Sequence, residues 1–232
     1  MTSIIQRIFR DHSFDILANT PFLSGERDFF AVNLQENAIN FYLVMFLDEI
    51  TNDFLDEQVP NFFYGIKSLE TGYDERMDKN LSLLICLKRK KELSNEERSQ
   101  EVFQVEEDPY FFKKYVLTYT EEQSHILEEL FKRDKTKNSQ QIINEVINNK
   151  DAFIELKNDP KKRSLYNLCS KLMIKIPFLI LERGKEQMED LKETIQTELR
   201  KAGLINYTTS LLQLESTENI ENIIRVFGGD EE

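Results

Sequence analysis

Apolar and polar residues are arranged differently in the two halves of the chain. In the first half, short apolar runs rich in β-branched and aromatic residues predict strands at 29–34, 41–47, 81–87 and 112–119. The run at 41–47 is apolar throughout, as in a central strand, but it also fits a buried helix that continues to Ile50.

Helical patterns frame these runs. We expect helices at 4–9 and 62–70, with the rings of Phe62, Phe63 and Tyr64 in the core. The charged stretch at 88–100 fits either a loop or an exposed helix.

From Thr120 onward the apolar residues recur at helical spacing. Thr120 with Gln123 three residues later predicts a capped helix start, and Glu121 and Glu122 lie favourably in its first turn. Further apolar stripes occur within 126–131, 142–147, 165–176, 188–199 and 220–227. Pro177 and Gly203 are typical residues for the ends of two of these helices.

These patterns together predict an α+β fold. A small N-terminal sheet with flanking helices occupies 1–119, and a helical region occupies 120–232. The two regions form either separate units or one continuous domain.

Composition bounds the class of protein. The 232 residues carry 30 basic and 42 acidic side chains, a net charge of −12 that disfavours non-specific binding to nucleic acid. The apolar runs are far shorter than the ~20 residues of a membrane helix, and Asp11 and His12 interrupt any leader-like start. We therefore expect a cytoplasmic protein without a membrane partner, with Cys86 and Cys169 as buried thiols.

Known catalytic patterns are missing from the sequence. The seven glycines form neither GxGxxG nor GxxxxGK[ST], so no nucleotide cofactor is predicted. His12 and His125 have no partner at metal-ligand spacing, and no nucleophile–base constellation is recognisable. The sequence predicts a protein that is not an enzyme.

A metal-dependent nuclease, or a decayed relative of one, is an alternative. Asp48, Asp78 and Glu106 to Asp108 lie near predicted strand ends, where such an enzyme keeps its acids. The strand at 84–88 ends in the required lysine but has isoleucine or leucine in place of the required acid. Solvated surface carboxylates are the favoured interpretation.

A small DNA-binding module is a second alternative. Two basic clusters are its candidate contacts: Lys88, Arg89, Lys90 and Lys91, and Lys161, Lys162 and Arg163. The second cluster follows Asp159 and Pro160, which we expect to be the N-cap and first residue of a helix, so backbone donors and cations would meet a phosphate there.

The segment from Glu106 to Tyr119 combines acids, aromatics and lysines. Pro109 disfavours a helical Asp108, so we expect the acidic run to be extended or turning. On an extended chain Tyr110, Phe111 and Phe112 cannot all point inward, so at least one ring is exposed, or covered by a partner or another segment.

This segment resembles the middle components of bacterial ABC-three-component systems, the group that includes Lamassu antiphage defence. The charged strand at 80–88 and the apolar helix at 219–224 support the resemblance. It implies a non-catalytic adaptor that joins an SMC-like coiled-coil ATPase and an effector, often a nuclease, in a hetero-oligomer that contacts DNA weakly or through its partners.

The chemistry of the side chains suggests which residues bind those partners. We expect the contacts at two places: Glu106, Glu107, Asp108, Tyr110, Phe111, Lys113 and Lys114, and the helical stripe of Met188, Leu191, Ile195 and Leu199.

Overall fold

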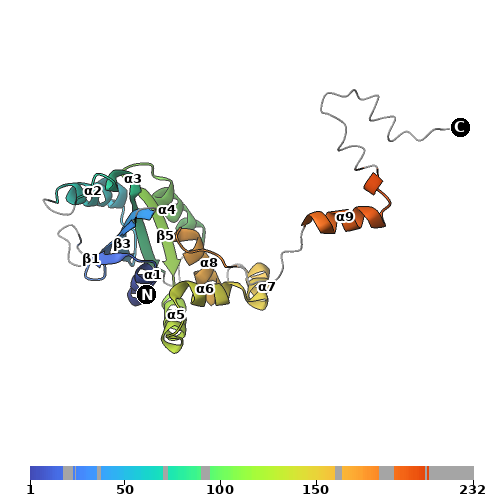
Figure 1. Cartoon of the computed structure of the whole chain (residues 1–232). Coiled ribbons are helices and arrows are strands. Elements are labelled where there is room, and N and C mark those ends of the chain that lie inside the picture. Colours follow the sequence, from blue (N-terminus) through green and yellow to red (C-terminus); the bar gives the residue numbers. More distant parts are fainter. Residues whose placement is uncertain are drawn as a thin grey trace, which may run out of the picture. The chain divides into compact units, whose positions relative to one another are not determined.

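The computed structural model covers the whole chain. The structure describes residues 1–17, 23, 25–35, 38–69, 73–89, 95–159, 164–182, 191–206 and 208, of which 38, 95–99 and 191 by backbone alone. The chain divides into two compact units, 1–182 and 183–232 (Figure 1).

A five-stranded mixed sheet forms the centre of the first unit. Its strands lie side by side in chain order: β1 (Asp15–Leu17), β2 (Phe29–Gln35), β3 (Ala38–Leu47), β4 (Leu81–Lys88) and β5 (Lys113–Tyr119). The β1–β2 and β2–β3 pairs are antiparallel, whereas β3–β4 and β4–β5 are parallel. Parallel neighbours need a crossover connection, and helices supply both crossovers.

One face of the sheet is covered by the first helix and by helices that follow the sheet. Alternate strand residues, among them Tyr42, Val44, Cys86 and Leu117, pack against this layer. The layer consists of α1 (Thr2–Asp11), α5 (Glu121–Arg133), α6 (Ser139–Ile147) and α8 (Leu165–Lys175). The short α7 (Lys150–Asn158) connects α6 to α8 and contributes no fully buried residue.

The opposite face is covered by the two crossovers. The β3–β4 crossover contains a π-helical turn, η1 (Phe54–Gln58), followed by α2 (Val59–Lys67) and α3 (Met77–Asn80). The β4–β5 crossover contains α4 (Asn95–Glu107). Phe54, Phe62 and Val105 from these helices share a hydrophobic cluster with Leu83 and Ile85 of β4.

The expected α+β fold is confirmed: the sheet lies in the N-terminal half and the described residues after it are helical (Figure 1). The run at 41–47 is a strand and not a buried helix, because it is hydrogen-bonded on both sides, to β2 and to β4. The helices from Glu121 to Lys175 share one hydrophobic core with the sheet.

Three local expectations are corrected. Glu106 and Glu107 form the last turn of α4, because a proline restricts only the residue before it, here Asp108. Asp159 ends α7 and does not begin the next helix; Ser164 caps α8 by accepting the Asn167 N–H. Tyr64 is exposed, and only Phe62 of the expected aromatic trio is fully buried.

The described part of the second unit centres on α9 (Leu191–Lys201). Its end confirms the glycine cap: Gly203 has φ +71°. Its N–H donates to the Arg200 carbonyl and the Leu204 N–H donates to the Leu199 carbonyl. These two bonds form a Schellman motif, which only a left-handed residue at position 203 permits without strain.

No helix in the described residues has the length and apolar character needed to cross a bilayer.

Candidate functional site

The turn between α4 and β5 is organised by one buried lysine. The Lys114 side chain is fully buried, and its Nζ donates to Asp108 Oδ1 at 2.5 Å. The same atom lies 3.2, 2.8 and 3.2 Å from the carbonyl oxygens of Asp108, Tyr110 and Phe112. The three N–H groups of this ammonium are shared among four acceptors of one short loop, which fixes the conformation of that loop.

The backbone of this turn is strained at Phe111. Phe111 has φ +67°, and the Phe112 N–H donates to the Tyr110 carbonyl at 2.9 Å, so residues 110–112 form a γ-turn with a positive central φ. A bulky residue in this region costs of order 1–3 kcal/mol, and such strain persists where the surroundings impose it. The hydrogen bonds from Lys114 Nζ to the carbonyl oxygens of Tyr110 and Phe112, on the two sides of Phe111, impose this conformation.

The turn sends its three rings in different directions. Phe112 is buried, whereas Tyr110 is 68% exposed. Phe111 packs on α2, with its ring centroid 5.3 Å from that of Phe63 and 6.1 Å from that of Tyr64. Tyr64 is itself 61% exposed. At least one exposed ring was expected from the sequence, and the structure has Tyr110 in that position.

We call Phe63, Tyr64, Tyr110 and Phe111 the aromatic surface. It joins two segments of the layer formed by the crossovers through the contact of the Tyr64 and Phe111 rings, 47 positions apart in the chain. Tyrosine and phenylalanine are enriched in protein interfaces, since a large rigid ring buries area at little entropic cost. Sequence reasoning missed Tyr64, although helical spacing from the buried Val59, Phe62 and Ile66 places it on the opposite side of α2.

The Glu106 carboxylate makes contacts within the protein. Its Oε1 accepts the Val116 N–H at 2.8 Å, and both carboxylate oxygens accept from Lys175 Nζ at 2.6 and 2.7 Å. β5 is the last strand of the sheet, so its outer N–H groups have no strand partner. Glu106 thus caps the sheet edge and ties α4 to α8, while Glu107 and Lys113 are exposed to solvent.

The basic residues expected to contact DNA are engaged with acids where they are described. Lys88 pairs with Glu121 at 3.0 Å, and Arg89, whose side chain is 9% exposed, pairs with Glu101 at 2.7 Å. Lys90, Lys91, Lys161, Lys162 and Arg163 lie outside the described residues.

Of the five acids of the nuclease alternative, all but the exposed Glu107 have a cationic partner in the described part of the chain. Asp48 lies 3.9 Å from Arg27, and Asp78 lies 3.1 Å from Lys67. Hydrogen bonds from Tyr73 and Lys67 lower the pKa of Asp78. Within the described ranges, no three His, Cys, Asp or Glu side chains are grouped so that they could hold a metal ion.

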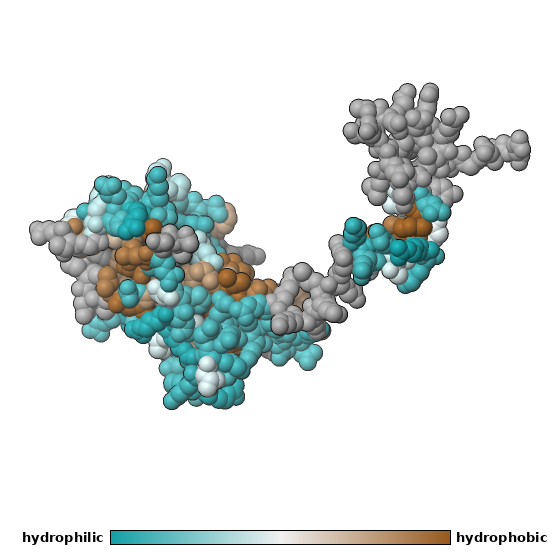
Figure 2. Space-filling model, viewed as in Figure 1, coloured by the Kyte–Doolittle hydropathy of each residue, from teal (hydrophilic) through white to brown (hydrophobic). Residues whose placement is uncertain are grey.

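The apolar stripe of α9 is exposed within its unit. Ile195 is 50% exposed and Leu199 is partly buried; Leu204, in the capping motif, is 48% exposed. Figure 2 shows hydrophobic side chains at the surface in this part of the chain, next to hydrophilic ones. Of the other stripe residues, Leu191 is described by its backbone within α9, and Met188 lies outside the described residues.

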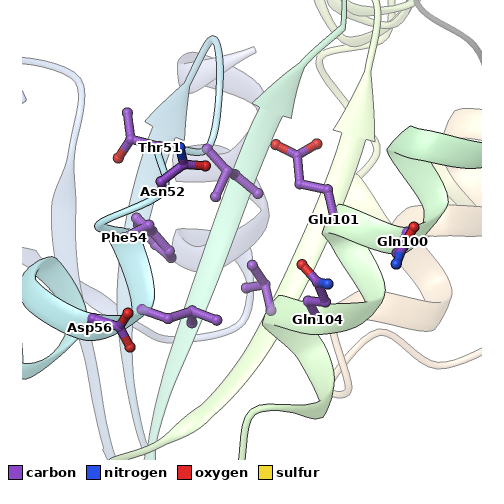
Figure 3. Close-up of a pocket in the computed structure, with 10 residues that line it drawn as sticks. Thr51, Asn52, Phe54, Asp56, Gln100, Glu101 and Gln104 are labelled. Atoms are coloured by element: carbon purple, nitrogen blue, oxygen red, sulfur yellow. The ribbon is translucent and has the colours of Figure 1, made fainter.

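A cleft of about 490 Å³ opens between η1 and α4. Figure 3 shows Thr51, Asn52, Phe54 and Asp56 on one side, and Gln100, Glu101 and Gln104 on α4 on the other side. Ile50, Leu55 and Val105 complete the lining, so the cleft has apolar residues beneath a polar rim. It follows the carboxyl end of β3, where open α/β sheets commonly bind ligands.

Comparison with known proteins gives one informative match. No curated protein and no solved structure matches the chain. The stretch that carries both the cleft and the aromatic surface, residues 46–151, matches the model of the family described as ABC-three component (ABC-3C) system Middle Component 1.

Proposed function

We propose that this chain is the middle component of a bacterial ABC-three-component system and acts in it as a non-catalytic adaptor. The observation that carries the proposal is the family match over residues 46–151. That range includes η1, α2, β4, α4 and β5, so it contains every residue of the aromatic surface and of the cleft.

The partners in this proposal are a coiled-coil ATPase of the SMC type and an effector subunit, in a cytoplasmic antiphage complex of the Lamassu type. Two features of the chain support an adaptor. The sequence contains no glycine-rich nucleotide loop, so ATP hydrolysis would be the task of another subunit. The described residues also present rigid aromatic side chains on a turn whose shape is fixed before any partner arrives.

The aromatic surface is the first docking site in this proposal. Tyr64 and Tyr110 have exposed rings, and the rings of Phe63 and Phe111 pack against each other and against Tyr64. Preorganised rings of this kind supply most of the binding energy in many interfaces. Asp108 and Lys114 support the site by holding the turn and do not themselves contact the partner.

Co-purification tests the proposal. The tagged chain is produced together with the products of its neighbouring genes, and the mass of the purified assembly is determined. We expect a stable hetero-oligomer that contains a large coiled-coil ATPase. A chain that elutes alone as a monomer, with all neighbours produced and soluble, would contradict the adaptor function.

A double substitution then tests whether the aromatic surface is the docking site. Tyr64→Ala with Tyr110→Ala should weaken the complex by at least tenfold in Kd, since two hot-spot rings are removed. Phe153→Ala is the matched control, because Phe153 is a 50% exposed ring on α7 outside this surface. Equal binding by the double variant and the control would move the docking site elsewhere.

A further inference from the structure

The cleft between η1 and α4 has the composition of a docking groove for a positively charged segment. None of the ten described residues that line it is a Lys, Arg or His. The Asp56 and Glu101 carboxylates and the side-chain amides of Asn52, Gln100 and Gln104 form its rim. Hydrogen-bond acceptors therefore surround an apolar floor made by Ile50, Phe54, Leu55 and Val105.

The charged residues on the η1 side of the cleft are acidic. From Asp48 to Ile66 the chain has five acidic residues and no basic one. Asp53, Asp56 and Glu57 lie at the start of η1 or within it and are exposed. Among the described residues, the rim carboxylate with a cationic partner is Glu101, whose Oε2 accepts from the Arg89 guanidinium at 2.7 Å. Asp56 is exposed, so its negative charge can attract a partner.

The backbone at the cleft is also unusual. η1 is a π-helical turn of five residues, and π-helical turns are rare and occur frequently at functional sites. The turn places Phe54 inward in the core and leaves Asp56 at the rim.

The cleft and the aromatic surface are built by the same two segments. η1 continues directly into α2, so residues 50–56 line the cleft and residues 63–64 belong to the aromatic surface. On the other segment, Gln100 to Val105 of α4 line the cleft, and the turn with Tyr110 and Phe111 follows the end of α4.

We propose that this cleft binds an amphipathic segment of a partner subunit that inserts an apolar side chain flanked by Lys or Arg. The apolar side chain packs on Ile50 and Leu55, which are the partly exposed apolar residues of the lining, and the cation binds the Asp56 carboxylate at the rim. The inference rests on the proposed adaptor function, because the partner is a subunit of that complex. It adds a second contact whose chemistry, unlike that of the aromatic surface, is electrostatic and sensitive to salt.

Charge reversal in the full-length chain tests the cleft. Asp56→Lys, produced with the neighbouring subunits, should weaken the complex about tenfold or more, and the loss should shrink as salt rises, since screening removes the attraction. Glu129→Lys makes the same change of charge on α5, in the other helical layer, and should leave binding unchanged. A cooperative melting transition in both variants shows that each remains folded.

A photo-crosslinking amino acid at Gln104 identifies the occupant. We expect cross-links to one peptide of a partner subunit that contains Lys or Arg beside an apolar residue. Cross-links only to a second copy of this chain, or to a peptide without a basic residue, would overturn the inference, as would normal binding by Asp56→Lys. In those cases the complex still forms and the adaptor function stands, whereas failure of the unaltered chain to form any complex rejects both.

Discussion

The Nζ atom of Lys114 lies 2.5 Å from Oδ1 of Asp108, and the lysine side chain is fully buried. The pair closes the turn that carries Tyr110 and Phe111, since Nζ also reaches three backbone carbonyls within it. A buried ion pair contributes little net stability when intact, but removal of one partner leaves the other desolvated and uncompensated.

Lys114→Met should therefore destabilise the protein strongly. Methionine keeps most of the side-chain volume but leaves the Asp108 carboxylate and three carbonyl oxygens without their donor. We expect the free energy of unfolding to fall by about 3 kcal/mol, measured by urea denaturation. Lys113→Met is the matched control: Lys113 is exposed, and its substitution should change stability by less than about 0.5 kcal/mol. Similar effects of the two substitutions would show that Lys114 does not organise the turn.

The buried Asp28 carboxyl should make the free energy of unfolding depend on pH. Its carboxylate is buried at 6% exposure and accepts the Phe46 N–H, and desolvation by burial raises its pKa above the ordinary value of 3.8. An acid whose pKa is raised by folding is protonated more readily in the folded state, so stability falls as pH rises from about 3.8 through the folded pKa.

Asp28→Asn should remove this dependence, because an amide oxygen can still accept the Phe46 N–H and carries no charge to desolvate. The measurement is the difference in unfolding free energy between the two proteins from pH 3.5 upward in roughly half-unit steps. The unaltered protein should lose stability relative to the variant as pH rises. A constant difference over the whole range would contradict the raised pKa of Asp28.

Both thiols should resist modification in the folded protein. Burial raises the pKa of Cys86 strongly and raises that of Cys169 to about 12, and neither side chain is accessible. We expect the reaction with a thiol reagent at pH 8 to follow the rate of unfolding and to be complete at once in denaturant. Rapid labelling of one thiol under native conditions would show that its helix or strand opens locally.

Much of the fold follows from patterns that a single chain encodes locally. The central strands β3 and β4 are apolar on both faces and could be recognised by that feature alone. The capping box of Thr120 and Gln123 and the glycine at 203 fix helix ends through contacts within a few residues. The expected resemblance to ABC-three-component middle components is supported by the family match, whereas the Lamassu type stays a prediction.

The features that escaped prediction depend on contacts between distant residues or on unusual backbone. β1 has three residues, too few for a periodic signal, and exists through its pairing with β2. Lys114 is buried although lysine is ordinarily exposed, because the acceptors of the turn surround it. The cleft joins residues near position 50 to residues near position 100, a proximity that only the two crossovers create.

The α9 stripe provides a test that is independent of the first unit. Ile195→Ser with Leu199→Ser removes apolar side chains from a helix outside residues 1–182. We expect the main melting transition to be unchanged and retention of the partner subunits in co-purification to fall at least severalfold. Thr197→Ser, also exposed on α9, is the control. Full retention of the partners by the double variant would exclude the stripe from the interface.

Because the backbone at Phe111 is strained, we expect glycine to be more stabilising than alanine at this position, the reverse of the usual order. At most positions alanine is more stabilising than glycine by about 0.4–1 kcal/mol, because glycine leaves the unfolded chain more freedom. At φ +67° the Cβ of alanine is itself strained, at a cost of roughly 1–2 kcal/mol. Both substitutions lose the ring that packs on Phe63 and Tyr64, so this loss cancels in their comparison.

Phe111→Gly should thus unfold with a free energy about 1 kcal/mol higher than that of Phe111→Ala. Among the non-glycine residues that the structure describes, Ser13 and Phe111 are those with positive φ. Tyr110 is not one of them, so Tyr110→Ala should be more stable than Tyr110→Gly. Denaturant titration of the four variants measures both differences. If glycine is the less stable choice at both positions, the turn is not strained, and the rings of the aromatic surface are not held in place before a partner binds.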